Sequence, residues 1–261
     1  MTRAPASPLL RADRGGVATL TLNRPERFNL LSDALLDALG EAFARLARED
    51  DLRCVVLGAS GRAFSAGHDL REMRARPGGH HRDLFARCGH VMQAIRALPV
   101  PVIAAVNGVA TAAGCQLVAA CDLAVAGESA RFAVSGIDVG LFCSTPAVAL
   151  TRAVPMKAAF DMLVTGRFID GAEALRIGLV NRVVPDGELA DAATAYAAAI
   201  AAKSAAAVRL GKRLVYEQAA MGLSEAYRHA ADAMARNMAE PDALAGIDRF
   251  LARSASRKDG R

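Results

Sequence analysis

The sequence predicts an α/β protein with a layered core and a helical C-terminal region. The chain has 261 residues, of which 53% are hydrophobic and 23% charged, a composition typical of a folded globular protein. Over residues 1–190, short β-rich runs alternate with helical patterns. Residues 191–261 are Ala-rich and nearly free of strand-forming residues. We therefore expect a core over 1–190 and a helical region over 191–261.

The first expected elements are a strand, a helix and a second strand. Residues 17–22 (VATLTL) are rich in β-branched side chains and predict a strand. A helix is expected from about Ser32, because apolar residues then recur at helical spacing. The next apolar run, at 54–57 (CVVL), predicts a buried strand. The helical spacing is carried by Leu35, Leu39, Ala42 and Leu46.

The next elements continue the alternation. A helix is expected over 83–98, ended by Pro99, and the apolar run 102–106 then predicts a buried strand. Small residues at 110–120 predict a closely packed helix, followed by a short apolar run at 123–125. The repeated order of strand and helix predicts the layered α/β core.

Charge and cysteine content narrow the classes of ligand. The chain has 32 Lys and Arg against 27 Asp and Glu, a net charge of +5 without a basic block, and it has three Tyr and no Trp. These features speak against a nucleic-acid partner and suit an anionic small molecule that carries phosphates. The five cysteines show no CxxC spacing, so we expect reduced thiols and neither a disulfide framework nor a zinc site.

Other composition features give expectations about location and metals. The sequence has no uninterrupted apolar run of eighteen residues and no apolar signal-peptide segment, so we expect no membrane span and a cytoplasmic protein. The five His residues lack ligand spacing with Asp or Glu, so no metal site is expected. A mobile loop is expected at about 74–82, where Gly78-Gly79 precedes His80-His81.

Two segments rich in small residues could present backbone amides to a ligand. In 62–71 (RAFSAGHDLR), Gly67 would let the backbone approach a ligand closely, with free N–H groups near His68. In 107–121, a strand ends in Asn-Gly and a helix begins near Ala112, so its first amides lack partners and could stabilise an oxyanion. An ordinary loop and a closely packed helix explain the same residues, and both alternatives remain open.

Longer segments resemble one known family. FSAGHDL, VPVIAAVNGVATAAGCQLVAACDLAVAGESARFA and LVTGRFIDGAEALRIGLVNRVVP resemble the crotonase (enoyl-CoA hydratase/isomerase) superfamily, as do TLNRPERFNLLSDALLDAL and DALAGIDRFLAR. AAGCQLVA and VGLFCSTP resemble one branch of it. The resemblance implies a crotonase (ClpP-like) fold of repeated ββα units and a helical region that forms trimers or dimers of trimers. It also implies an acyl-CoA thioester as substrate and no cofactor beyond that CoA.

The resemblance also assigns roles to individual residues. The two N–H groups that hold the thioester carbonyl fall on His68 and Ala113. Phe250 would lie near the nucleotide. Arg27 and Arg71 could pair with the CoA phosphates, although a solvated surface charge would explain either arginine equally well. The other residues expected along the CoA are Glu26, Arg27, Phe28, Ala66, Gly67, Asp69 and Leu70.

The acid/base residues of a typical hydratase are missing. The two glutamate positions of the family fall on Gln116, a neutral amide, and on Gly136, which has no side chain. Each lost group should cost about 10²- to 10⁴-fold in rate, so efficient hydration is not expected. Asp138 or Cys143 could substitute. A surface or loop carboxylate explains Asp138 equally well, and for Cys143 a small buried thiol without a catalytic role is the favoured interpretation.

Three interpretations of function therefore stand. The first is an enoyl-CoA hydratase-like enzyme that stabilises a thioester enolate. The second is a non-catalytic acyl-CoA-binding protein that keeps the amides for affinity. The third is a hydrolase, isomerase or lyase of the same fold that uses Asp138 or Cys143. Ser144, next to Cys143, is expected as the N-cap of a helix opened by Pro146.

Overall fold

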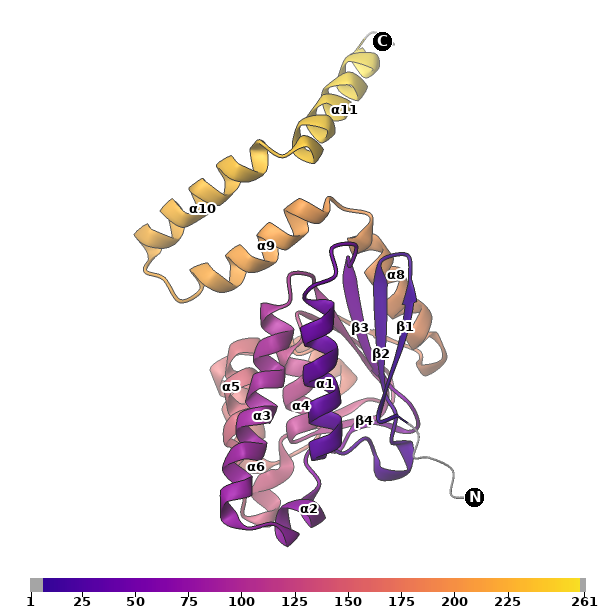
Figure 1. Cartoon of the computed structure of the whole chain (residues 1–261), viewed down its shortest axis with the longest axis vertical. Helices are drawn as coiled ribbons and strands as arrows, with labels where there is room; N and C mark the ends of the chain where they lie inside the picture. The colour runs from indigo at the N-terminus through magenta and orange to yellow at the C-terminus, as the bar shows by residue number, and fades with distance from the viewer. Residues whose placement is uncertain (1–6, 259–261) are drawn as a thin grey trace. The chain divides into compact units, whose positions relative to one another are not determined.

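The computed structural model describes residues 7–258 and divides the chain into two compact units, Met1–Ala198 and Ala199–Arg261 (Figure 1). The boundary between the units lies inside α8 (Leu189–Ala201). The boundary expected from the sequence, at residue 190, lies in the same helix. The roles assigned to the two parts, acyl-CoA binding and oligomerisation, stay predictions. Each unit is described by itself below.

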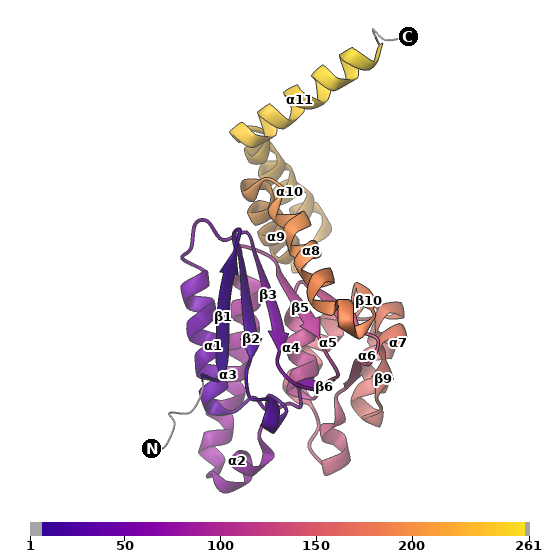
Figure 2. The ribbon, with the colours of Figure 1, turned by 90° about the vertical axis from the view of Figure 1, so that its right-hand side faces the viewer.

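Two sheets form the frame of the first unit. The larger sheet has six strands in the order β1-β2-β3-β5-β7-β10, and the smaller has four in the order β4-β6-β8-β9. Neighbouring strands run parallel except for β1 with β2 and β8 with β9. Figure 2 shows β1, β2, β3 and β5 side by side. The strands are β1 (Leu9–Arg14), β2 (Val17–Leu22), β3 (Cys54–Ala59), β4 (Ala63–Ser65), β5 (Val102–Val106), β6 (Val109–Thr111), β7 (Leu123–Gly127), β8 (Arg131–Ala133), β9 (Ile169–Asp170) and β10 (Arg182–Val184).

The helices of the first unit follow the strands. Three short 3₁₀ helices are η1 (Pro25–Arg27), η2 (Ser135–Val139) and η3 (Asp186–Glu188). The α-helices before α8 are α1 (Asp33–Leu46), α2 (Leu70–Ala75), α3 (Gly78–Ala97), α4 (Ala113–Ala120), α5 (Ser144–Ala153), α6 (Met156–Thr165) and α7 (Gly171–Arg176).

The chain builds the two sheets by repeating one unit. A strand of the larger sheet is followed by a strand of the smaller sheet and a helix in β3-β4-α2, in β5-β6-α4 and, with η2 inserted, in β7-β8-α5. This order confirms the expected crotonase fold of repeated ββα units. The second strand of each pair was not predicted, because β4, β6 and β8 have three residues each and cannot show an alternating pattern.

Of two helices predicted in this unit, α1 begins where the sequence indicates and α3 begins earlier. The helix expected from Ser32 is α1, which Ser32 caps by accepting a hydrogen bond from the Leu35 amide at 3.4 Å. The helix expected over 83–98 begins earlier, at Gly78 of α3, so most of the loop expected at 74–82 is helical. Contacts outside the local sequence stabilise the first turns of α3. His81 Nε2 lies 2.7 Å from the Met73 carbonyl oxygen, and His80 Nε2 lies 3.4 Å from Asp33 Oδ2.

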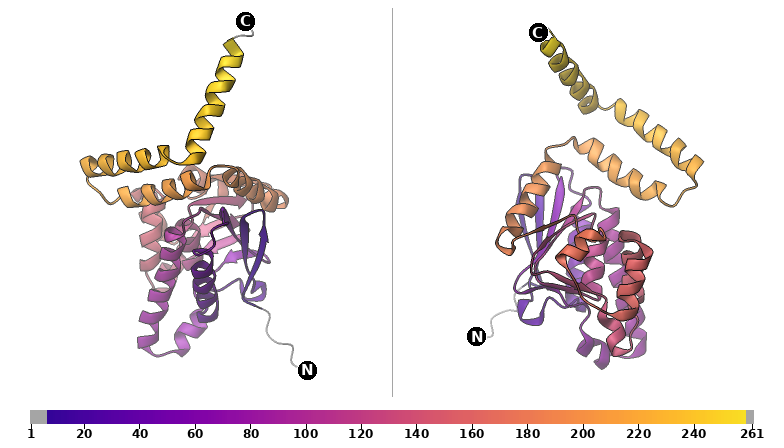
Figure 3. Two further views of the ribbon diagram at one scale, coloured as in Figure 1. Left: turned by 45° about the horizontal axis from the view of Figure 1, so that its top comes forward. Right: turned by 180° about the vertical axis from the view of Figure 1, so that it is seen from behind.

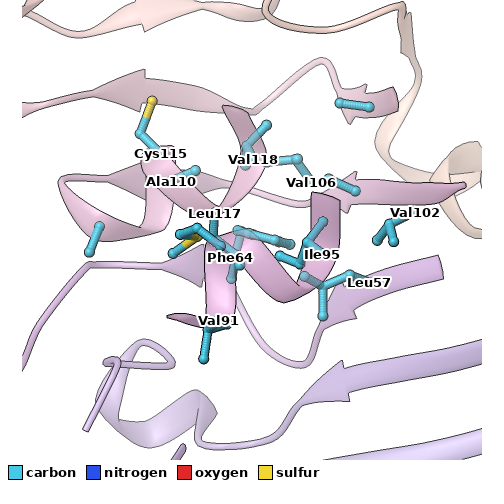
Figure 4. Packing of buried hydrophobic residues seen from close by; sticks show 14 of the residues in the cluster. Leu57, Phe64, Val91, Ile95, Val102, Val106, Ala110, Cys115, Leu117 and Val118 are labelled. Atoms are coloured by element: carbon cyan, nitrogen blue, oxygen red, sulfur yellow. The ribbon is translucent and has the colours of Figure 1, made fainter. Parts of the chain in front are cut away.

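Buried side chains from both sheets and several helices of the first unit pack in one hydrophobic core. Phe64 of β4, Ile95 of α3 and Leu117 of α4 are fully buried in one cluster (Figure 4). Burying a side chain of this size stabilises the fold by roughly 1.5–3 kcal/mol. The start of α4 and the end of β4 are therefore anchored in the same core.

The second unit is helical, as expected for the C-terminal region. It contains α9 (Ala205–Gln218), α10 (Leu223–Met238) and α11 (Pro241–Lys258). Figure 3 shows α9 and α10 packed side by side. Along the described part of the chain, no helix combines the length and the apolar character needed to cross a membrane.

Candidate functional site

The turn after β4 lies unusually close to the start of α4. Gly67 has φ +84°, and a Cβ atom on it would lie 2.9 Å from the Ala112 Cβ atom and 3.2 Å from the Ala113 nitrogen. Strands β4 and β6 are parallel neighbours, so the turns that follow them lie at the same end of the sheet. Glycine is required here both by the left-handed backbone and by this close approach.

The turn after β6 leaves an amide without a partner. Ala112 has φ 51° and ψ −120°, a strained conformation for a non-glycine residue, and its own N–H donates to the Ala133 carbonyl at 3.0 Å. Ala113 is then the first residue of α4, a position whose N–H has no partner within the helix. Within residues 7–258 neither the Ala113 N–H nor the His68 N–H donates a hydrogen bond.

Both residues line one cavity. Its volume is about 300 Å³. It is lined by Ala66, His68, Leu70, Met73, Phe85, Ala112, Ala113, Ser135, Gly136, Val139, Leu141, Phe142, Cys143, Ser144, Thr145 and Pro146. Two N–H donors from separate turns beside one cavity are suited to a carbonyl oxygen that gains negative charge. The geometry therefore agrees with the pair of amide-presenting loops expected from the sequence, and their roles stay predictions.

The His68 side chain is neutral. Its Nδ1 atom lies 3.2 Å from the Leu31 carbonyl oxygen, which assigns the proton to Nδ1, and its ring meets Phe85 edge-on with centroids 5.6 Å apart. Within the described residues the Nε2 atom is buried and has no partner. Burial lowers the pKa of His68, and the Leu31 hydrogen bond opposes this effect only in part.

Gln116 lies behind the cavity and does not line it. The side chain is 3% exposed, and its Oε1 atom accepts hydrogen bonds from Thr145 Oγ1 at 3.4 Å and, more weakly, from Cys88 Sγ at 3.9 Å. An amide held in this way is unable to take up a proton at neutral pH. Its expected role, orienting water or a carbonyl, stays a prediction.

The space beside Gly136 is filled by its own loop. The Leu141 N–H donates to the Gly136 carbonyl at 2.9 Å, which closes a turn over the glycine. A Cβ atom on Gly136 would lie 2.5 Å from the Leu141 carbonyl oxygen and 2.8 Å from Cys143 Sγ. No larger side chain fits at this position without moving the turn, a constraint that the sequence did not reveal.

The two residues proposed to replace the glutamates differ in their surroundings. Cys143 is buried, lines the cavity and precedes the first residue of α5. Burial raises the pKa of its thiol, so the thiol is protonated at neutral pH. Asp138 is exposed on η2 and lies outside the cavity lining. The expected N-cap role of Ser144 is wrong: Ser144 is the first residue of α5, Cys143 is the N-cap, and the Ser144 hydroxyl donates to the Phe142 carbonyl at 3.3 Å.

The residues expected along the CoA include an ion pair between the buried Asp69 and the half-exposed Arg27, which sequence reasoning missed. Asp69 is 4% exposed, pairs with Arg27 and accepts hydrogen bonds from the Arg71 and Glu72 amides at 3.0 and 3.3 Å. It thereby caps α2 directly after His68 and ties the turn to η1. Phe28 is exposed with φ 51°, and the Arg62 guanidinium carbon lies 4.5 Å from its ring centroid.

The remaining expected site residues divide between the two units. Ala66 and Leu70 line the cavity, whereas Glu26 lies on η1 and Phe250 lies on α11 in the second unit. Their roles toward CoA stay predictions. Among the described residues, no group of three or more His, Cys, Asp and Glu side chains could hold a metal ion.

The chain is similar in sequence to known proteins over most of its length. The family model described as enoyl-CoA hydratase/isomerase matches residues 12–258. Enoyl-CoA hydratase domain-containing protein 3, mitochondrial, of Rattus norvegicus is 47% identical over 237 residues, which cover 90% of this chain and 79% of that protein.

Solved structures are similar over nearly the whole chain. A crystal structure of an enoyl-CoA hydratase from Mycobacterium smegmatis superposes with a TM-score of 0.93 at 58% identity and covers 94% of this chain and 96% of its own. That of human enoyl-CoA hydratase domain-containing protein 3 has a TM-score of 0.91 at 44% identity, covering 94% and 98%. These similarities confirm the branch that AAGCQLVA and VGLFCSTP resemble.

One expectation is wrong. Relatives from rat, mouse, frog, human and zebrafish, at 43–47% identity, carry the word mitochondrial in their names, which contradicts the expected cytoplasmic localisation. The expectation rested on a composition without long apolar runs. Such a composition is shared by soluble proteins of different compartments, so it does not distinguish between them.

The closed turn over Gly136 predicts a cost for adding one methyl group there. Gly136→Ala should lower the free energy of unfolding by about 1–3 kcal/mol, because the new Cβ overlaps the Leu141 carbonyl and Cys143 Sγ. Gly187→Ala is the matched control, since nothing lies within 4 Å of a Cβ there, and should change stability by less than about 0.5 kcal/mol. Urea unfolding followed by circular dichroism measures both, and equal effects would contradict the closed turn.

Burial of His68 predicts a pH dependence of stability. Its pKa in the folded protein lies below the ordinary value of 6.5, so the unfolded chain binds more protons as the pH falls through 6.5. The free energy of unfolding should therefore fall from pH 8 to pH 5, and the slope should be shallower in His68→Gln. His90→Gln, at an exposed position, should keep the wild-type slope. Identical slopes in all three proteins would show that His68 is not held neutral.

Proposed function

Because the chain belongs to the enoyl-CoA hydratase/isomerase family, the crotonase superfamily, we propose that it binds an acyl-CoA thioester in the cavity beside His68 and Ala113. One observation carries the proposal: two backbone N–H groups without partners lie at one cavity, on turns that Gly67 brings together. In this proposal both N–H groups donate to the thioester carbonyl oxygen.

The same donors would lower the energy of an enolate. When a proton leaves the carbon next to the thioester, negative charge moves to the carbonyl oxygen, where preorganised N–H donors stabilise it. The Ala113 N–H also stands at the N-terminus of α4, where the helix dipole favours negative charge. No cofactor other than the CoA of the substrate enters this proposal.

Efficient hydration of an enoyl-CoA is not part of the proposal. Gln116 accepts hydrogen bonds from Thr145 and Cys88 and does not line the cavity, and Gly136 has no side chain. Of the residues that line the cavity, His68 and Cys143 alone have ionisable side chains. The His68 Nε2 atom is buried and the Cys143 thiol is protonated, so neither is set up to deprotonate water.

The same observation favours a second candidate, a non-catalytic acyl-CoA-binding protein. Such a protein would keep the N–H donors for affinity without groups that move protons. The candidate of a hydrolase, isomerase or lyase draws support from Cys143, which lines the cavity, and little from Asp138, which does not. Turnover of the thioester is the property that separates these candidates.

Assembly into trimers or dimers of trimers remains part of the proposal. Leu223, Tyr227 and Met234 lie on one side of α10 at helical spacing, and each is more than 70% exposed. An exposed apolar stripe of this kind supports contact with another subunit.

Removing the Ala113 N–H tests the proposed carbonyl contact. Ala113 is the first residue of its helix, so Ala113→Pro deletes the donor at a helix position that accepts proline, and circular dichroism checks that the variant keeps its fold. Calorimetry should show about tenfold weaker binding of an acyl-CoA. Binding of the matching S-alkyl-CoA thioether, which lacks the carbonyl, should not change.

The control for this variant removes an equivalent N–H elsewhere. Ala205 is the first residue of α9 and does not line the cavity, so Ala205→Pro should leave both affinities unchanged. Equal weakening of the thioester and the thioether by Ala113→Pro would contradict the carbonyl contact, as would no weakening at all.

Hydration of crotonyl-CoA tests the loss of the acid/base pair. Typical enzymes turn over at about 1 to 10³ s⁻¹, and two missing groups should lower this by at least about 10⁴-fold, to below about 0.1 s⁻¹. The assay follows loss of the enoyl thioester in a preparation shown by calorimetry to bind acyl-CoA. Turnover of about 1 s⁻¹ or more would mean that another group has taken over proton transfer.

A further inference from the structure

A buried hydroxyl group lies beside the turn that carries the His68 N–H. Ser65, the last residue of β4, is 0% exposed and does not line the cavity. Its Oγ atom donates to the Asn29 carbonyl at 2.8 Å and accepts from the Gly67 N–H at 3.3 Å. The Ser65 hydroxyl therefore binds the backbone of the turn, and its proton is not available to a ligand.

The same turn is also bound through its backbone to the segment 28–31. The Leu31 N–H donates to the Gly67 carbonyl at 2.8 Å. In a trans peptide the C=O and N–H groups point in opposite directions. The peptide between Gly67 and His68 is trans, so the bond from Leu31 directs the His68 N–H away from the segment 28–31. The direction of this donor therefore depends on how the turn is held.

Asn29 fixes the carbonyl to which the Ser65 hydroxyl donates. It is 0% exposed and has a left-handed backbone with φ 51°, a conformation that asparagine adopts more readily than most residues. Its Oδ1 atom accepts from the Arg24 N–H at 2.7 Å, and its Nδ2 atom donates to the Ser60 and Ala63 carbonyls at 2.9 and 2.8 Å. The Asn29 carbonyl is therefore a fixed partner for Ser65.

Ser65 also contacts the second turn of the site. A Cβ atom on Gly114, the second residue of α4, would lie 2.2 Å from the Ser65 carbonyl oxygen and 2.9 Å from the Ser65 Cβ atom. The α4 helix therefore begins in direct contact with Ser65, one residue after the Ala113 N–H. Ser65 thus touches the backbone segments that carry both N–H donors.

We propose that Ser65 is a positioning residue whose hydroxyl fixes the direction of the His68 N–H and its spacing from the Ala113 N–H. This inference rests on the proposed function, in which both groups donate to a thioester carbonyl. It adds a residue that does not contact the ligand. Without the hydroxyl, the Gly67 N–H and the Asn29 carbonyl would be buried without these partners, and the turn would shift to pair them. A donor moved in this way makes a weaker bond, because hydrogen bonds lose strength away from linear geometry.

Two measurements on Ser65→Ala test this inference. The first is the Kd of an S-alkyl-CoA thioether divided by the Kd of the matching acyl-CoA thioester, since only the thioester has the carbonyl. Loss of the hydroxyl should lower this ratio about threefold or more. The second is the infrared stretching frequency of an isotope-labelled thioester carbonyl, which N–H donors lower and which should be higher in Ser65→Ala than in the wild type. A variant that is merely less stable keeps both values in its folded fraction.

Ser60→Ala is the matched control. The Ser60 hydroxyl also donates to a backbone carbonyl, that of Leu22, at 3.0 Å, and Ser60 lies outside the cavity lining. Ser60→Ala should therefore keep the wild-type ratio and the wild-type carbonyl frequency. Circular dichroism checks that both variants are folded. Equal changes in Ser65→Ala and Ser60→Ala would overturn the inference.

Ser65→Cys carries the test if Ser65→Ala does not fold. A thiol is a weaker donor and acceptor than a hydroxyl, so Ser65→Cys should show the same two changes to a smaller extent. A folded Ser65→Ala with wild-type values of both quantities would overturn the inference and leave the proposed function standing, as would such a Ser65→Cys where the alanine variant does not fold. If the wild-type protein binds the thioester no more tightly than the thioether, the proposed function itself fails.

Discussion

The close approach of two backbone turns is the constraint on which the site depends. Gly67 comes so near to Ala112 and Ala113 that a side chain on it would overlap them. The parallel pairing of β4 with β6 fixes both turns at one end of the smaller sheet. Phe64 and Leu117 anchor the adjoining segments in the core, so the positions of the two N–H donors follow from the fold as a whole. A donor pair fixed in this way needs no rearrangement when charge develops on a bound oxygen.

The close approach of the two turns costs free energy, which packing and hydrogen bonds in the rest of the fold offset. Ala112 keeps a strained backbone conformation, which costs of order 1–3 kcal/mol, and the N–H groups of His68 and Ala113 give up protein hydrogen bonds. The buried Asp69 carboxylate caps the first turn of α2 directly after His68 and also pairs with the half-exposed Arg27. Strain and unpaired donors gathered at one cavity are typical of a binding or catalytic site.

Much of the fold follows from local sequence, and less of the site does. The sequence predicts β2, β3, β5 and α1. The strand patterns of β2, β3 and β5 and the helical spacing of α1 are each long enough to be recognised locally. The three-residue strands β4, β6 and β8 and the early start of α3 were not predicted, because contacts outside the local sequence define them. His68 and Ala113 were identified through family resemblance, whereas the Asp69–Arg27 pair and the closed turn at Gly136 depend on long-range packing that no motif encodes.

The closed turn also bears on the two positions, 116 and 136, at which the family resemblance implies glutamates in a typical hydratase. A glutamate at position 136 would need the space that the Leu141 carbonyl and Cys143 Sγ now occupy, so the turn over 136–143 would have to open first. Thr145, at the start of α5, donates a hydrogen bond to Gln116, so position 116 also contacts the segment 136–145. A glutamate introduced at position 136 alone would therefore not fit beside the segment 136–145. A glutamate introduced at position 116 alone would still meet Thr145 of that segment. Under the proposed function, the difference from a typical hydratase site therefore lies in the path of this segment as much as in the two side chains.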